Sequence, residues 1–326
     1  MLEGAEDFPI TLALALLSLL LLTPAPALAE DLDERLAVQP GGLLQVDLDL
    51  GEDLRSDRVS LDVRSHDADE VWAVADLSGL GASSVKFRIE QDDQVVRLYG
   101  RAGGLMSWLF GGPGVSVRVW VPRKFAVDLR CPTGSIHLEE ISGEIRARTH
   151  DGTIDVNGAE GQLHLRTREG AVRVTEVLGD VTVRAGAGPI ELSWLTGNVQ
   201  ARTGRGDIQA KHIDGQTDLR TDEGEITIRD LRGAADVKTE RGAVYASFVG
   251  PPEGRLETRR GSVEVAFPDH VGLQLDARSG QGRVELGHGI KAHGKRETNR
   301  FVGAINGGGS PLWIYTTRGT IRVHRR

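Results

Sequence analysis

Residues 165–174 read LRTREGAVRV, and residues 219–228 repeat the phrase as LRTDEGEITI. The glycine of each phrase belongs to a longer series, in which one glycine follows another after eighteen residues. The series comprises Gly134, Gly152, Gly170, Gly188, Gly206, Gly224 and Gly242, and it continues with irregular spacing at Gly261, Gly282 and Gly319. Such a repeat decides the fold, because each unit must bury its apolar face against a neighbouring copy.

A second glycine series divides each repeat into two half-units of nine residues. It comprises Gly143, Gly161, Gly179, Gly197, Gly215 and Gly233. Between the glycines, apolar residues occupy alternate positions, as in Ile154 and Val156 or Val172 and Val174, and this is the period of a strand. The sequence therefore predicts an all-β parallel β-solenoid with about 18 residues and two strands per turn. Roughly ten rungs at ~4.8 Å each would give a rod of ~50 Å.

Three related repeat architectures fit less well. A hexapeptide β-helix divides its turn into three sixes, whereas the inward residues here fall into two nines. Calcium-binding nonapeptide rolls place Asp at one fixed position, but Asp151, Asp155, Asp207 and Asp214 lie at four different positions of the repeat. Polysaccharide-cleaving β-helices use longer rungs, whose loops build a cleft, and the short turns predicted here leave little chain for such loops.

Residues 30–127 lack the strict period. Alternating apolar residues at 85–89 and 95–99 flank Asp92 and Asp93 and predict a hairpin, and residues 115–121 predict a further strand. A solenoid needs an atypical end that covers its core and its unpaired edge. We therefore expect an irregular N-terminal β cap at 30–127, continuous with solenoid repeats at 128–326.

The repeated phrase fits the pattern L-R-T-x-x-G-x-[IV]-x-[VIL], and a strand ending in Val121-Pro122 precedes the first rung. In these features residues 40–326 resemble a bacterial β-strand-repeat domain of unknown function, described as a candidate adhesin. The resemblance implies a secreted or envelope-associated solenoid with no established activity. It offers no catalytic residues to carry over to this sequence.

The start of the chain predicts export. Residues 10–22 form an almost unbroken apolar run, and Ala27 and Ala29 provide the small residues of a cleavage site before Glu30. The run is too short for a spanning helix, which needs about 20 apolar residues. Residues 1–29 are thus expected to be a signal peptide. The segment before the run lacks Lys and Arg, so either the signal is atypical or the start codon is assigned wrongly. No second long apolar run follows, so we expect no transmembrane segment in the mature chain.

Composition narrows the compartment and the class of partner. The chain has 326 residues and one cysteine, Cys131, so no internal disulfide can form. An exported chain without disulfides favours the bacterial periplasm or cell surface, and Cys131 is expected to be a packed, inert thiol. Acidic residues outnumber basic ones by 47 to 39, giving a net charge of -8. This argues against a nucleic-acid partner, which would favour a basic excess.

No sequence motif predicts catalysis, a metal site or a cofactor. The chain has no nucleophile elbow, phosphate-binding loop or dinucleotide fingerprint. His137, His150, His164 and His212 fall at different positions of the repeat, without the spacing of zinc ligands. Adjacent carboxylates such as Glu139 and Glu140 would point to opposite faces of a strand, which makes them poor acid/base partners.

The one candidate site is a basic position four residues before each glycine of the first series. It is occupied by Arg130, Arg148, Arg166, Arg184, Arg202, Arg220 and Lys238. The alternation points these side chains outward, and stacking would place like charges ~5 Å apart, at a cost of ~0.8 kcal/mol per neighbouring pair in water. Either Asp151, Glu169, Glu223 and Glu240 neutralise the column, or the column binds an extended polyanion.

The position after the basic residue is mostly threonine. It is occupied by Thr149, Thr167, Thr203, Thr221, Thr239 and Thr258, with Cys131 and Ala185 as exceptions. We expect these hydroxyls to bond the turn backbone and to have a structural role.

Taken together, the sequence predicts a non-enzymatic exported cell-envelope protein, adhesin-like or a scaffold. Its expected partner is an envelope polysaccharide or a protein. The alternative is an enzyme acting on polysaccharide.

Overall fold

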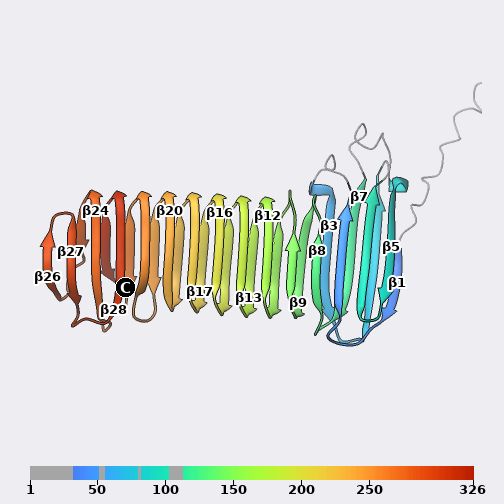
Figure 1. Cartoon of the computed structure of the whole chain (residues 1–326), viewed down its shortest axis with the longest axis horizontal. Helices are drawn as coiled ribbons and strands as arrows, with labels where there is room; N and C mark the ends of the chain where they lie inside the picture. Colours follow the sequence, from blue (N-terminus) through green and yellow to red (C-terminus); the bar gives the residue numbers. More distant parts are fainter. Residues whose placement is uncertain (1–31, 51–55, 80–81, 103–112) are drawn as a thin grey trace, which may run out of the picture.

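The structure is a computed structural model that describes residues 32–50, 56–79, 82–102 and 113–326. Figure 1 shows an elongated stack of strands, with the N-terminal strands at one end and the C-terminal strands at the other. The strands form two long sheets, sheet A with 14 strands and sheet B with 15 strands. The predicted parallel β-solenoid is thereby confirmed.

Sheet A begins at the N-terminal end of the stack with β1. Its strands, in spatial order, are β1 (Leu32–Ala37), β4 (Glu70–Ser78), β7 (Gly114–Pro122), β3 (Val59–His66), β9 (Ser135–Ser142), β11 (Ile154–Glu160), β13 (Val172–Leu178), β15 (Ile190–Thr196), β17 (Ile208–Asp214), β19 (Ile226–Arg232), β21 (Val244–Phe248), β23 (Val263–Phe267), β29 (Ile321–Arg325) and β25 (Val284–Leu286).

Sheet B begins at the same end with β5. Its strands, in spatial order, are β5 (Val85–Asp92), β6 (Val95–Ala102), β2 (Leu43–Asp49), β8 (Ala126–Arg130), β10 (Ile145–Arg148), β12 (Leu163–Glu169), β14 (Val181–Ala187), β16 (Val199–Arg205), β18 (Thr217–Glu223), β20 (Ala234–Arg241), β22 (Glu253–Arg260), β28 (Ser310–Arg318), β24 (Leu273–Gln281), β27 (Arg300–Ile305) and β26 (Ala292–Glu297). Within the described residues, the N-terminal region also contains the short 3-10 helices η2 (Ser56–Arg58) and η3 (Ala82–Ser84).

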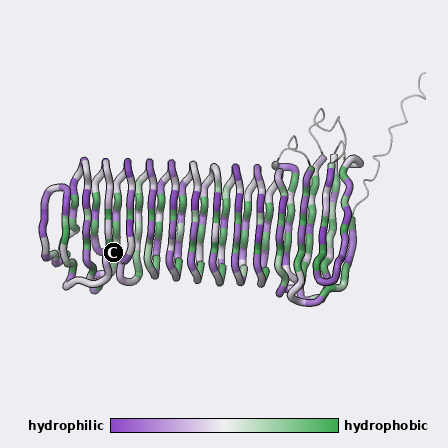
Figure 2. Tube along the Cα trace, in the orientation of Figure 1, coloured by the Kyte–Doolittle hydropathy of each residue, from purple (hydrophilic) through white to green (hydrophobic). Residues whose placement is uncertain are grey.

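The apolar residues of both sheets point into a thin core between them. In β17, Ile208 and Ala210 are buried while Gln209 and Lys211 are exposed, so inward and outward residues alternate as the sequence predicts. Figure 2 shows the same alternation of apolar and polar residues along the strands of the stack. From β9 to β20, each strand pairs in parallel and in register with its copy one rung away, as Ile190 does with Ile208. The eighteen-residue period is therefore the period of the parallel ladder.

Glycine and threonine together build one corner of each rung. At Gly206 φ is 145°, and an added Cβ would lie 2.2 Å from the carbonyl oxygen of Gly188 in the neighbouring rung. No side chain fits there, so the glycine period follows from close backbone stacking. The buried Thr221 hydroxyl donates a hydrogen bond of 3.1 Å to the Gly206 carbonyl. The predicted structural role of the threonine column is confirmed, since equivalent bonds join Thr149 to Gly134, Thr167 to Gly152, Thr203 to Gly188, Thr239 to Gly224 and Thr258 to Gly242.

At the C-terminal end, the order of the rungs departs from the order of the chain. Strand β28 lies between β22 and β24, and β29 lies between β23 and β25. The glycines therefore stack in the order Gly261, Gly319, Gly282, which corrects the sequential series that their spacing suggested. The hairpin of β26 and β27 then pairs antiparallel with β24. The last rung of the chain is thus enclosed. An antiparallel hairpin ends the ladder of sheet B, whereas the ladder of sheet A ends at the short parallel strand β25.

The N-terminal end repeats this arrangement. Strands β2 and β3 pair in parallel with β8 and β9 of the first regular rung, while β6 and β7 pair with them on the outside. Antiparallel strands β5 and β4 then cover β6 and β7. The predicted hairpin and the predicted strand at 115–121 are present as β5–β6 and β7. The parallel ladder therefore extends further into this region than the glycine period indicates.

Two predictions stay open. The signal peptide at 1–29 lies outside the described residues, and the division between cap and solenoid at 127/128 stays a prediction. Among the residues that the structure describes, there is no helix with the length and apolar character needed to cross a membrane.

Candidate functional site

The seven basic residues form one continuous column on the outer face of sheet B. Each is exposed, and each pairs in register with the next along the ladder from Arg130 to Lys238. This placement follows from the alternation, because the preceding residue of each strand is buried. We call these residues the basic column; they are Arg130, Arg148, Arg166, Arg184, Arg202, Arg220 and Lys238.

Carboxylates neutralise only part of the basic column. Arg148 lies 3.6 Å from Asp128, and Lys238 lies 3.8 Å from Glu240. Asp218 serves two members, since it accepts hydrogen bonds from Arg220 at 2.8 Å and from Arg202 at 3.4 Å.

Of the four carboxylates expected to neutralise the column, Glu240 alone does so within the described part of the chain. Glu223 pairs instead with Arg241. Two other carboxylates, Asp128 and Asp218, pair with the column. Each lies two residues before a column position and points to the same outer face, and each reaches a column residue of the neighbouring strand; Asp218 also reaches Arg220 on its own strand. The column therefore draws its counter-charges from its own face of the sheet rather than from the turns.

Three members of the basic column, Arg130, Arg166 and Arg184, have no ion pair or side-chain hydrogen bond within the described ranges. Beyond the two ends of the column, the same position is acidic. Asp47 precedes Arg130 in the ladder, and Glu257 follows Lys238. Acidic residues therefore flank a stretch of seven cations on both sides. The middle of this stretch carries uncompensated positive charge.

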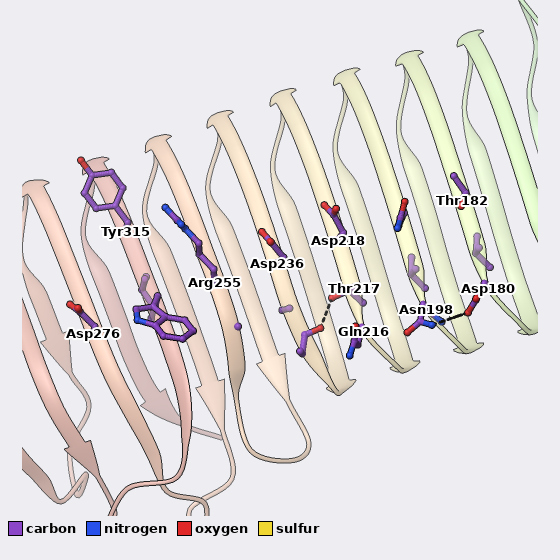
Figure 3. Close-up of a pocket in the computed structure, with 18 of the residues that line it drawn as sticks. Asp180, Thr182, Asn198, Gln216, Thr217, Asp218, Asp236, Arg255, Asp276 and Tyr315 are labelled. Carbon is purple, nitrogen blue, oxygen red and sulfur yellow. Dashed lines mark hydrogen bonds between the residues drawn. The ribbon is translucent and has the colours of Figure 1, made fainter.

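A groove lies beside the basic column on the same face of sheet B, and Figure 3 shows a part of its lining. Its volume is about 1140 Å³, and it runs across the strands from β12 to β24. Its polar lining comes from outward residues at the beginnings of these strands. The floor at β20 and β22 carries the small residues Ala234, Ala235 and Gly254. Side chains therefore leave room there, and the face is hollowed.

Four aspartates line the groove: Asp180, Asp218, Asp236 and Asp276. Asp180 accepts hydrogen bonds from the backbone and side-chain nitrogens of Asn198 at 2.9 and 3.1 Å, a contact drawn in Figure 3. Asp276 accepts two bonds from Arg278, and these bonds and the charge of Asp276 raise the pKa of the Arg278 guanidinium above its ordinary value. Asp218 is bound to Arg220 and Arg202. Asp236 is therefore the groove aspartate that has no amide or guanidinium partner in the part of the chain that the structure describes.

Two aromatic side chains stand at the C-terminal end of the groove. Trp313 is 50% exposed and Tyr315 is 40% exposed, and both point outward from β28. Trp313 pairs in register with Arg255, and Tyr315 pairs with Glu257, which directly follows the basic column. The aromatic residues therefore lie in line with the columns of the groove and of the basic residues.

Sequence reasoning missed these aromatics, although a signal was present. Trp313 and Tyr315 alternate with the buried Leu312 and Ile314, so the strand period already points both rings outward. What the sequence did not show is their place in line with the basic column, where Glu257 lies between Lys238 and Tyr315. That place arises because β28 is inserted out of chain order.

The outer face of sheet A carries a different feature. The ring of Trp194, which is 59% exposed, stacks on His212 with centroids 4.0 Å apart, and His212 lies 3.4 Å from Asp230. All three residues have φ between 53° and 59° and occupy one column.

Within the described ranges, no cluster of His, Cys, Asp and Glu could hold a metal ion. Cys131 is fully buried, and its burial raises the pKa of the thiol to about 12.

Comparison with known proteins identifies the family of this chain. A family model described as Toastrack DUF4097 matches residues 161–324, just over half of the chain. A candidate cell adhesion protein from Clostridium sporogenes ATCC 15579 is 13% identical, with a TM-score of 0.21, over 91% of this chain and 100% of its own. A candidate adhesin from Bacteroides fragilis NCTC 9343 is 10% identical, with a TM-score of 0.34, over 91% of this chain and 97% of its own. No curated protein matches the sequence. The chain belongs to the Toastrack DUF4097 family.

Proposed function

We propose that this chain is an exported, non-enzymatic envelope protein that binds an anionic polymer along the basic column. One observation carries the proposal: seven cations lie in register on one exposed face, and Arg130, Arg166 and Arg184 lack a carboxylate partner within the described residues. Like charges at the spacing of a parallel ladder repel one another. A polymer with regularly spaced anionic groups would relieve this repulsion at several rungs at once.

The carboxylates of the groove support binding rather than polysaccharide cleavage. Hydrolysis of a glycosidic bond usually needs two carboxyl groups in complementary roles. Asp180, Asp218 and Asp276 are each held by an amide or a guanidinium group. The groove therefore offers no second free aspartate that could take the catalytic role complementary to that of Asp236.

The binding test replaces Arg166, Arg184 and Arg202 together by Gln. Binding of long-chain polyphosphate and of polygalacturonate is titrated at low and high salt. We expect the wild-type affinity to fall steeply with salt and the triple variant to lose at least about tenfold at low salt, because three cations are removed from one site. An unchanged affinity in the triple variant would exclude this role of the column.

A matched control removes the same charge from the opposite face. Arg173, Lys211 and Arg229 are exposed on the outer face of sheet A, and their replacement by Gln alters the net charge equally. We expect this control to bind like the wild type. Incubation of the wild type with polygalacturonate, followed by an assay for new reducing ends, tests the enzymatic alternative. Release of reducing ends would overturn the non-enzymatic assignment.

A further inference from the structure

The groove beside the basic column has features that a simple polyanion site does not need. From this we infer that the anionic polymer is an acidic polysaccharide, whose sugar rings stack on Trp313 and Tyr315 while its acidic groups face the basic column. This inference rests on the proposed function and names the chemical class of the ligand. Its two parts lie on one sheet face, because Tyr315 follows Lys238 and Glu257 in the same ladder position.

The aromatic residues provide the first argument. Rings of Trp and Tyr that stand half-exposed on a rigid strand offer flat apolar surfaces, and the apolar face of a sugar ring packs on such surfaces. β28 is paired on both sides, with β22 and with β24, so its backbone is fixed. Trp313 and Tyr315 are two residues apart and point to the same side. They form a platform at the end of the groove.

The hydrogen-bonding groups of the groove provide the second argument. Gln200, Gln216 and Asp236 line it on successive rungs, and their side chains have no hydrogen-bond partner within the described residues. Amides both donate and accept, and a carboxylate accepts from hydroxyl groups. A polysaccharide presents many hydroxyl groups, whereas a polyphosphate chain presents anionic oxygens that Asp236 would repel. The groove therefore suits a polymer with both hydroxyls and acidic groups.

The direction of the groove provides the third argument. It crosses the strands from β12 to β24, so it runs along the rod, parallel to the basic column. Neighbouring strands are ~4.8 Å apart, and each rung adds one side chain to each column. A linear polymer lying in this direction meets one basic side chain of the column on each rung from β12 to β20, and polar side chains of the groove beside it. A compact ligand would use only one or two rungs.

The experiment compares polymers with and without sugar rings. The Trp313→Ala/Tyr315→Ala variant and the wild type are titrated with three acidic polysaccharides (polygalacturonate, alginate and hyaluronate) and with long-chain polyphosphate. We expect the variant to lose about tenfold in affinity for at least one acidic polysaccharide and none for polyphosphate. Trp194→Ala, which removes an exposed tryptophan from sheet A, is the matched control and should bind like the wild type.

The outcomes separate this inference from the proposed function. If polyphosphate binds and no acidic polysaccharide does, or if the aromatic variant loses affinity for both equally, the inference fails and the proposed function stands. If the aromatic variant keeps full affinity for every acidic polysaccharide, the inference also fails. If the wild type binds none of the four polymers, both fail. Both rings point outward from β28, and an unchanged melting temperature verifies that the variant folds.

Discussion

The middle of the stack and its two ends differ in the order of their rungs and in the residues that fill their core. From β9 to β20 each rung follows the previous one in chain order, and the buried residues are aliphatic apart from threonine. At the ends, the first and last rungs of the chain are enclosed by rungs from elsewhere in the sequence. The large buried phenylalanines Phe125, Phe248, Phe267 and Phe301 all lie toward these ends.

The difference shows what limits a solenoid. In the middle, every rung presents the same inward surface, so uniform aliphatic residues fill a core of constant thickness. At an end, the parallel ladder would expose unpaired backbone and an open core. At the N-terminal end, antiparallel strands cover both sheets: β5 in sheet B, and β4 followed by β1 in sheet A. At the C-terminal end, β27 and β26 cover sheet B, while sheet A stops at the short parallel strand β25. Three predictions test this comparison.

The largest effect is expected in the middle. Ile208→Asp places a carboxylate at a site with 0% exposure in β17, and an unpaired buried charge should cost more than ~4 kcal/mol in free energy of unfolding. Gln209→Asp, one residue further on the exposed face, is the matched control and should change the melting temperature little. Equal melting temperatures for the two variants would contradict the assignment of inward and outward residues.

A smaller and local effect is expected at the C-terminal end. Phe301→Ala removes a buried ring from β27, which pairs with β24, and should destabilise this end by ~3–5 kcal/mol. Because each rung contacts mainly its neighbours, hydrogen exchange should accelerate in β24, β26 and β27 while β13 to β18 stay protected. The exposed neighbour Arg300→Ala should leave the exchange pattern unchanged. Loss of protection along the whole rod would mean that the ends and the middle unfold as one unit.

The smallest effect at neutral pH concerns Cys131, where the regular stack begins, because its effect is confined to alkaline pH. Burial raises the pKa of its thiol from 9.0 to about 12. Between these pH values the unfolded chain loses the thiol proton and the folded chain retains it. The free energy of unfolding should therefore fall as pH rises from about 9 to 12, by up to ~1.4 kcal/mol per pH unit.

The variant Cys131→Thr gives this corner the residue that the next two rungs have there, Thr149 and Thr167. It should lack that part of the pH dependence. Denaturant titrations across this pH range, with wild type and variant in parallel, make the measurement. Identical pH profiles would show that Cys131 does not titrate differently in the two states. Rapid alkylation of the native wild type by iodoacetamide would contradict its burial.

The sequence by itself determined the solenoid and its surface columns. The positions of Gly206 and Thr221 relative to their neighbouring rungs, and the outward direction of Arg166, follow from local rules that act within one rung and the next. Strand alternation sets the direction of a side chain, and the spacing of the glycines sets the register. For this reason the basic column could be predicted residue by residue.

Only the tertiary structure decided the order of the end rungs and, with it, the composition of the groove. Every rung presents an equivalent inward face, so the period cannot tell which rung stacks on which. The insertion of β28 between β22 and β24 brings Trp313 next to Arg255 and Tyr315 next to Glu257. That order depends on which edges the antiparallel hairpins cover, a long-range property that no local pattern of residues contains.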